Sequence, residues 1–235
     1  MALPKLDAPR YELKVPSTGK KATYRPYLVK EEKVLMLALE SNDEKQMIRA
    51  MKDVINTCTE GSVDVEKMAM FDLEYIFMQL RGKSVGEKTE IGVKCKSCET
   101  KNDVLVDLDK VKVNVPKESA RKIALTSTVG VTMKYPSVND IMDIQSSDDS
   151  EVEKLFNLIG TCIDSVYSGG EIFDAEGQSA QEIRDFIESL NSDQFNKIKD
   201  FIQDMPSAGI SVDFTCSNCS THNNFEVKGI ANFFS

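Results

Sequence analysis

The sequence predicts an α+β fold made by tandem duplication of one unit, in which a β-hairpin is followed by helices and then by a hairpin carrying a Cys-x-x-Cys pair. Two such pairs occur, and each lies between runs in which apolar and polar residues alternate. Aligned on their cysteines, CKSCETKNDVLV and CSNCSTHNNFEV share Thr, Asn and Val at the same offsets. INTCTEG (55–61) also matches IGTCIDS (159–165), which places Cys58 and Cys162 in equivalent positions.

The first half begins with two predicted strands around the turn PSTG, within residues 11–27. LVKEEKVLMLALE (28–40) reads as a helix whose apolar residues are dense enough to cover more than one face. SNDE (41–44) has the form of a capping box, so a second helix is expected to begin there. Apolar residues at helical spacing then carry this helix as far as Cys58: Met47, Ile48, Met51, Val54 and Ile55.

A further helix is predicted for FDLEYIFMQLRGK (71–83), ended by Gly82. TEIGV (89–93) and DVLVDL (103–108) alternate on either side of the first cysteine pair, which predicts a hairpin with the cysteines at its turn.

The second half repeats this order, beginning with a hairpin over RKIALTSTVGVTMKYPS (121–137). A helix is predicted from Val152 to Val166 on the spacing of Leu155, Phe156, Ile159 and Ile163. An insertion at 168–190 carries its own capping box, SAQE. A last helix is predicted at 192–205, ended by Pro206, before the second cysteine hairpin.

We therefore divide the chain into a first repeat, residues 1–115, and a second repeat, residues 116–235, joined near VNVPKESA (113–120). By analogy with the isologous contact of a homodimer, similar halves are expected to pack about a pseudo-twofold axis. Such an axis could bring the two cysteine hairpins face to face.

Charge and composition exclude several classes of function. The chain has 235 residues, a net charge of −9 and an isoelectric point near 4.8, so it lacks the basic footprint of a nucleic-acid-binding protein. The longest aliphatic run, VLMLAL (34–39), is too short to span a bilayer. We expect a cytosolic setting, in which the six cysteines stay reduced and serve metal binding, redox chemistry or plain burial.

The two cysteine pairs predict one structural zinc ion per chain, held in a zinc-ribbon-like site that joins the two repeats. Structural zinc takes four thiolates in a tetrahedron, and each hairpin turn presents two sulfur atoms on one side. The 117 residues between the pairs exceed the usual ribbon spacing, and the duplication accounts for this gap. The predicted ligands are Cys95, Cys98, Cys216 and Cys219.

Two other interpretations of the cysteine pairs stay open. A thioredoxin-like pair would precede a helix, whereas both pairs here lie between strands. Alternatively, the hairpins could be held by packing alone, without a metal ion. His222, the sole histidine, could replace one ligand but is better explained as a solvated loop residue. Cys58 and Cys162 lie on or beside apolar helix faces and are expected to be buried.

No catalytic motif competes with this interpretation. The sequence has no GxSxG, no GxxxxGK[ST] and no GxGxxG after a strand, and one histidine beside a cysteine pair leaves little for a catalytic triad. The acidic run SSDDSEVE (146–153) is typical of a solvated loop and a first helical turn. We therefore expect a protein without enzymatic activity.

Several long segments, ordered along the chain, resemble the baseplate hub subunit of T4-like contractile-tailed phages. They are MALPKLDAPRYELKVPSTGKKATYRPYLVKEEKVLMLALES, MFDLEYIFMQLRGKSVGEK, VTMKYPSVNDI and the closing GIANFFS. This resemblance implies a non-enzymatic virion protein of the tail baseplate, made in the bacterial cytoplasm. It implies other baseplate hub and tail proteins as partners, and neither nucleic acid, membrane nor a small-molecule substrate.

Three functions remain open: a permanent hub component, an assembly chaperone absent from the finished virion, and a zinc-ribbon regulatory or redox protein. Candidate contact surfaces are Phe233 and Phe234 at the end of the chain, and the helix of residues 28–40. For both surfaces, burial in the core is the plainer expectation.

Overall fold

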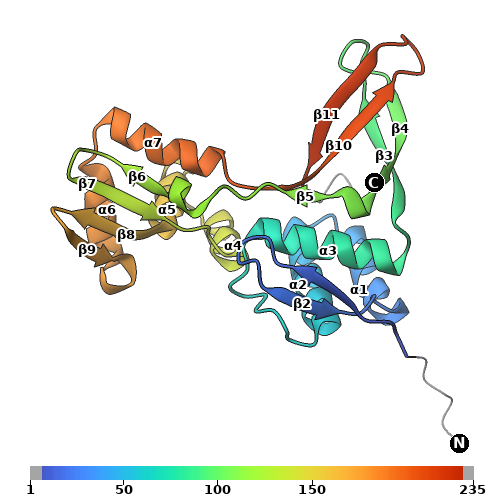
Figure 1. Cartoon of the computed structure of the whole chain (residues 1–235), viewed down its shortest axis with the longest axis horizontal. Coiled ribbons are helices and arrows are strands. Elements are labelled where there is room, and N and C mark those ends of the chain that lie inside the picture. The colour runs from blue at the N-terminus through green and yellow to red at the C-terminus, as the bar shows by residue number, and fades with distance from the viewer. Residues whose placement is uncertain (1–6, 230–235) are drawn as a thin grey trace, which may run out of the picture. The chain divides into compact units, whose positions relative to one another are not determined.

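The computed structural model describes residues 7–229, which form two compact units (Figure 1). Unit 1 comprises Met1–Asn114 together with Ser207–Ser235, and unit 2 comprises Val115–Pro206. The chain therefore leaves unit 1 near the predicted join of the repeats and returns to it for the second cysteine hairpin. The fold is mixed α+β, as predicted. The tandem duplication and the two repeats, 1–115 and 116–235, stay predictions.

Unit 1 begins with a hairpin and three helices. The hairpin pairs two short antiparallel strands. Between this hairpin and residue 84, most of the buried apolar side chains lie on the three helices. In chain order the elements are β1 (Tyr11–Lys14), β2 (Lys21–Tyr24), α1 (Val29–Glu40), α2 (Glu44–Thr59) and α3 (Met70–Ser84).

Two of the predicted helix boundaries in this part are wrong. Asp43, not Ser41, caps α2, because its carboxylate accepts from the backbone N–H groups of Lys45 and Gln46. Ser41 instead lies at the C-terminal end of α1, where its hydroxyl donates to the Ala38 carbonyl. Gly82 does not end α3, which continues to Ser84. It packs against η1 (Leu108–Lys110), where an added Cβ would lie in ordinary contact, 3.6 Å from Leu108 Cβ.

The rest of unit 1 consists of two hairpins that lie side by side (Figure 1). The first hairpin pairs β3 (Lys88–Lys94) with β4 (Lys101–Asp107). The second pairs β10 (Ala208–Thr215) with β11 (His222–Lys228), and β10 also pairs with β5 (Lys112–Val113). Buried side chains from both hairpins and from α3 form one apolar cluster: Met78, Ile91, Val93, Val106, Leu108, Val111, Ala208, Ile210, Val212 and Val227. The alternation of the sequence therefore marks the inward faces correctly.

Unit 2 is a four-stranded antiparallel sheet, in the order β6-β7-β8-β9, with helices around a core of its own. The buried core residues are Leu125, Val131, Met133, Ile159, Cys162, Ile163, Ile187 and Ile198. The strands are β6 (Lys122–Ala124), β7 (Val129–Met133), β8 (Ile163–Ser168) and β9 (Glu171–Asp174). The helices are η2 (Glu118–Arg121), α4 (Val138–Ser146), α5 (Glu151–Cys162), η3 (Ala175–Gly177), α6 (Ala180–Glu188) and α7 (Ser192–Gln203).

The helix predicted to reach Val166 ends at Cys162, and the next residues form β8. Ile163 and Val166 fit a helical spacing, but both are β-branched, and β8 fills the middle of the sheet between β7 and β9. The predicted SAQE capping box is confirmed, because the Ser179 hydroxyl accepts from the Glu182 N–H and the Glu182 carboxylate accepts from the Ser179 N–H.

The two helix-borne cysteines make the same backbone contact in their respective units. In unit 1 the Arg25 N–H, just after β2, donates to the Cys58 carbonyl at 3.0 Å. In unit 2 the Lys134 N–H, just after β7, donates to the Cys162 carbonyl at 2.7 Å. Both cysteines are buried, as predicted, and burial raises the pKa of Cys58 to about 11 and that of Cys162 to about 12.

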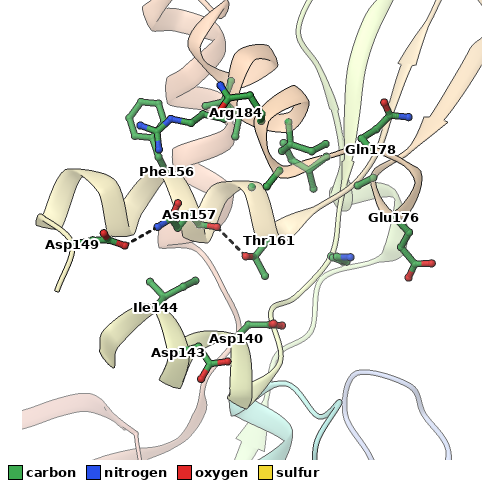
Figure 2. A pocket seen from close by; sticks show the side chains of 18 of the residues that line it. Asp140, Asp143, Ile144, Asp149, Phe156, Asn157, Thr161, Glu176, Gln178 and Arg184 are labelled. Carbon is green, nitrogen blue, oxygen red and sulfur yellow. Dashed lines mark hydrogen bonds between the residues drawn. The ribbon is translucent and has the colours of Figure 1, made fainter. Parts of the chain in front are cut away.

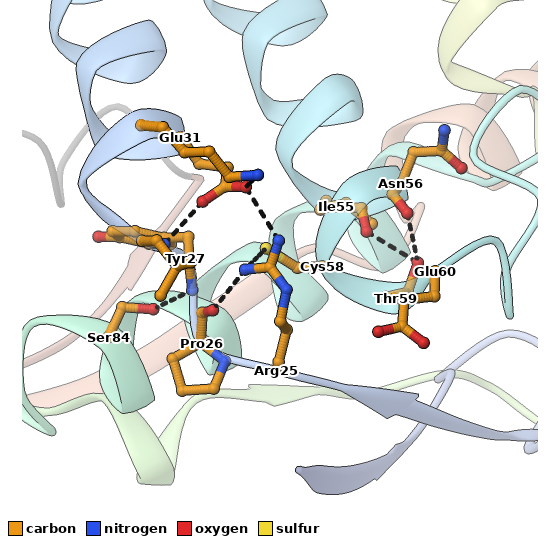
Figure 3. Close-up of polar contacts among 12 residues, drawn as sticks. Arg25, Pro26, Tyr27, Glu31, Ile55, Asn56, Cys58, Thr59, Glu60 and Ser84 are labelled. Atoms are coloured by element: carbon orange, nitrogen blue, oxygen red, sulfur yellow. Dashed lines mark hydrogen bonds and ion pairs between the residues drawn. The ribbon is translucent and has the colours of Figure 1, made fainter. Parts of the chain in front are cut away.

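Around Cys58 the side chains add an ion pair (Figure 3). The Arg25 guanidinium donates to Glu31 at 2.9 Å and lies 3.7 Å from the Cys58 sulfur. Glu31 also accepts from the Leu28 N–H at 2.8 Å, so this largely buried carboxylate fixes the first turn of α1 against the hairpin.

Candidate metal centre

The four cysteines predicted as ligands come together at the tips of the two hairpins in unit 1. Their sulfur atoms all lie within 4.8 Å of one another. Two of these separations cross between the hairpins: Cys95 to Cys219 at 3.7 Å and Cys98 to Cys216 at 3.6 Å. These distances are far beyond the ~2.05 Å of a disulfide bond, and all four cysteines are free.

Each hairpin turn is folded so that both of its cysteines face the other hairpin. In the first turn the Cys95 N–H donates to the Thr100 carbonyl, and the Glu99 N–H donates to the Cys95 carbonyl. In the second turn the same two bonds join Cys216 to Thr221 and Ser220 to Cys216. The residue after each second cysteine has a positive φ, +58° at Glu99 and +57° at Ser220, which reverses the chain within a few residues.

Two asparagines connect the turns reciprocally. The Asn102 side-chain oxygen accepts from the Ser217 N–H at 2.9 Å, and its amide nitrogen lies 3.7 Å from the Cys216 sulfur. Asn223 does the same in the other direction. Its oxygen accepts from the Lys96 N–H at 3.0 Å, and its amide nitrogen lies 3.4 Å from the Cys95 sulfur.

These asparagines are buried, and their amides also donate to the Thr100 and Thr221 carbonyls of their own turns. Each asparagine therefore fixes its own turn and orients the opposite one. The sequence contained the relevant signal, an Asn four residues after the second cysteine of each pair, but that pattern alone assigned no role to Asn102 or Asn223.

Hydrogen bonds to the sulfur atoms favour thiolates on the first hairpin. Backbone N–H groups of Cys98 and Ser97 lower the pKa of Cys95, and Thr100 lowers the pKa of Cys98 to about 6. For Cys219, Thr221 acts in the same direction, but the neighbouring Cys98 and Cys95 sulfurs and burial together outweigh it and raise the pKa. Four sulfur atoms this close cannot all lose their protons unless a cation balances the charge.

The donor set fits a tetrahedral metal ion. Four sulfurs at ~2.3 Å from a central zinc ion lie ~3.8 Å from each other, close to the separations across the hairpins. Within residues 7–229, no other group of three or more potential ligand side chains is close enough to share an ion. His222 lies outside this set, exposed on β11 with its ring 3.4 Å from Asp213.

A separate hollow of about 780 Å³ lies within unit 2 between α4, α5 and α6 (Figure 2). Its wall includes the carboxylates of Asp143 and Glu176 and the Phe156 ring. Arg184 borders it but is held by Glu153, at 2.7 and 3.0 Å. The lining of the hollow includes no histidine or cysteine.

The two predicted contact surfaces differ in outcome. Phe233 and Phe234 lie outside the described residues. In α1, burial in the core was expected for the apolar side chains. Leu35 and Ala38 are buried, but several other large apolar side chains of this helix are exposed. No helix within the described part of the chain is both long and apolar enough to cross a membrane.

Comparison with known families adds an independent finding. The sequence model of the family described as T4 bacteriophage base plate protein matches residues 8–235, essentially the whole chain. Comparisons with curated proteins and with solved structures give no match.

Proposed function

Since the chain belongs to the T4 bacteriophage base plate protein family, as its sequence resemblance predicted, we propose that it is a non-enzymatic structural component of the baseplate hub of a contractile phage tail. Family membership implies a location in the tail baseplate of the virion and association with other phage baseplate proteins. That the partners are hub proteins in particular, and that assembly takes place in the host cytoplasm, are parts of this proposal.

The observation that carries the structural role is the family match over residues 8–235. The reciprocal cysteine turns support a role for metal in that structure, because a site closed by four thiolates has no open position for a substrate or an activated water. One zinc ion bound by Cys95, Cys98, Cys216 and Cys219 would hold β3–β4 to β10–β11. Its binding free energy, on the order of 10 kcal/mol in such sites, is comparable with the whole stability of a domain.

Quantitative mass spectrometry of purified phage particles tests the structural role. A permanent component should be present in a fixed ratio to other baseplate proteins. An assembly chaperone would be found in infected cells but not in finished particles, and that result would overturn the proposal.

Elemental analysis of protein prepared in metal-free buffer tests the zinc centre. We expect about one equivalent of zinc per chain, the count for a four-thiolate site. Zero or two equivalents would contradict it. Reversible oxidation of these thiols near cytosolic potentials would instead favour a redox or regulatory protein, since structural zinc thiolates resist such oxidation.

A further inference from the structure

Helix α1 has an apolar face that no described residue of unit 1 covers. Its inner face is formed by Glu31, Leu35 and Ala38, and Figure 3 shows Glu31 directed toward Arg25. Its outer face exposes Val29 by 79%, Met36 by 59% and Leu37 by 56%. Large apolar side chains that are this exposed and this close together on one helix are typical of a binding surface rather than of a solvated helix.

Two opposite charges bracket the centre of this outer face. Lys33 and Glu40 are seven residues apart, so they lie on the same stripe of the helix, with Met36 and Leu37 between them. Both are exposed, and neither has an ion-pair partner within residues 7–229. They cannot reach each other, since seven residues of helix span ~10.5 Å.

The order of these four residues is self-complementary. A twofold axis through the midpoint between Met36 and Leu37 reverses the helix direction. Along the helix, position 33 of one copy then lies level with position 40 of the other, and position 36 with position 37. In an antiparallel pair of such helices, Lys33 of each copy faces Glu40 of the other. Met36 and Leu37 flank this stripe on opposite sides, so each packs against its own counterpart in the other copy. An isologous contact requires this pattern, in which one surface carries both halves of each interaction.

We propose that α1 is a self-association surface, through which a second copy of this chain docks antiparallel about a twofold axis between Met36 and Leu37. The contact is small, because one helix of 12 residues per copy buries less than the ~800 Å² per partner of a standard interface. A dissociation constant of roughly 10–100 µM is therefore expected. In an assembly that already holds two copies close together, a contact of this strength forms fully. This inference does not depend on the proposed baseplate role.

Sedimentation equilibrium of the full chain, from about 5 to 500 µM, measures the association expected in this range. The chain should change from monomer to dimer over these concentrations. Lys33→Glu alone and Glu40→Lys alone place like charges opposite each other and should each weaken dimerisation by about ten-fold or more. Lys20→Glu and Glu90→Lys, which reverse exposed charges elsewhere in unit 1, are matched controls and should leave it unchanged.

Two restorations make the test specific to the antiparallel twofold. The double variant Lys33→Glu/Glu40→Lys carries the same charges in exchanged positions, so it should dimerise like the wild type. An equimolar mixture of the two single variants should also dimerise, because each supplies the charge that the other lacks. A wild type that stays monomeric at the highest concentration would overturn the proposal. So would a dimer that the single reversals do not weaken, or weakened dimers that neither restoration recovers.

Discussion

Two pairs of matching segments in this chain differ in how far their contacts correspond. Between the cysteine turns, Asn102 and Asn223 exchange the same hydrogen bonds in both directions. The two hairpin–helix segments, at Cys58 and at Cys162, share the backbone bond to the cysteine carbonyl. They also share an acidic residue in the first turn of the next helix, Glu31 in α1 and Asp140 in α4, which accepts from the N-cap N–H. Their other side-chain contacts differ. Arg25 pairs with Glu31, whereas Lys134 has no ion pair in the described part of unit 2.

This difference follows from what each pair must do. The cysteine turns form one cluster of four sulfur atoms and exchange hydrogen bonds, so each must offer the other the same geometry. A change in one turn leaves the other without its partners. The hairpin–helix segments belong to different units, and each contributes buried side chains to the interior of its own unit. A backbone hydrogen bond is enough for that, and the surrounding side chains are free to differ.

Breaking the shared centre should give the largest effect. Cys95→Ser removes one of four thiolates, so we expect a loss of zinc and a melting temperature lower by about 5 °C or more. Most of the helical circular dichroism should remain, with new proteolysis near residues 93–104 and 213–227. Cys162→Ala, in unit 2, is the control that should keep its zinc.

The double variant Cys95→Ser/Cys216→Ser decides whether the cysteines act as one site. Because a single lost ligand already disables a shared centre, the double variant should melt close to either single variant. Calorimetry of the three proteins measures this. Fully additive losses would show that the two turns do not share one metal ion.

Removing the cation near each buried cysteine should reduce the unfolding free energy by different amounts in the two hairpin–helix segments. Arg25→Met removes the closest ion-pair partner of the largely buried Glu31 and leaves the more exposed Lys30, 3.3 Å away. The change should cost up to about 3 kcal/mol of unfolding free energy. Lys134→Met removes no ion pair and should cost less than about 0.5 kcal/mol. Urea unfolding of both variants measures the two changes in unfolding free energy. Similar losses would contradict the view that only the first segment depends on an ion pair.

Much of this fold was predictable because its signals are local. Alternation identified β3, β4, β10 and β11, and the paired spacing identified the four cysteines. Helix ends were harder, because Ser41 and Asp43 are both good caps two residues apart, and tertiary contacts choose between them.

Other features depend on contacts between distant segments. The end of α5 at Cys162 depends on β7 and β9 taking Ile163 and Val166 into a sheet. The role of Asn102 requires knowing that Ser217 lies opposite it. In the same way, an apolar-rich stretch does not reveal which of its faces stays exposed, as α1 illustrates.

Disrupting the reciprocal asparagines should have an intermediate effect. Asn102→Ala leaves the Ser217 N–H without its acceptor, and Asn223→Ala does the same to the Lys96 N–H. Each variant should lose about 1–3 kcal/mol of stability and about 10- to 100-fold in zinc affinity. Competition with a chromophoric chelator measures the affinity, and the neighbouring, exposed Asn224→Ala is the control. Strongly unequal losses from the two variants would contradict the reciprocity.

The smallest expected effect is a pH dependence that belongs to the first hairpin–helix segment. Burial by itself would raise the pKa of Glu31, but hydrogen bonds from Arg25 and the Leu28 N–H outweigh it and lower the pKa. A carboxyl whose pKa is lowered by folding stabilises the protein above its unfolded pKa, ~4.3 for Glu, and this contribution is lost as the pH falls through the folded value. Unit 1 should therefore lose stability below about pH 5.

Asp72, also in unit 1, has a pKa shifted in the opposite direction, so its contribution to the pH dependence must be distinguished from that of Glu31. Burial raises its pKa, despite hydrogen bonds from Ser17, so its ionisation reduces stability as the pH rises. Asp72→Asn keeps an acceptor for the Ser17 N–H and should make unit 1 slightly more stable at neutral pH. Glu31→Gln should instead flatten the decline on the acid side. Urea unfolding from pH 3 to pH 8 distinguishes the two carboxyls. An acid decline that Glu31→Gln leaves unchanged would show that the Arg25–Glu31 pair is not its source.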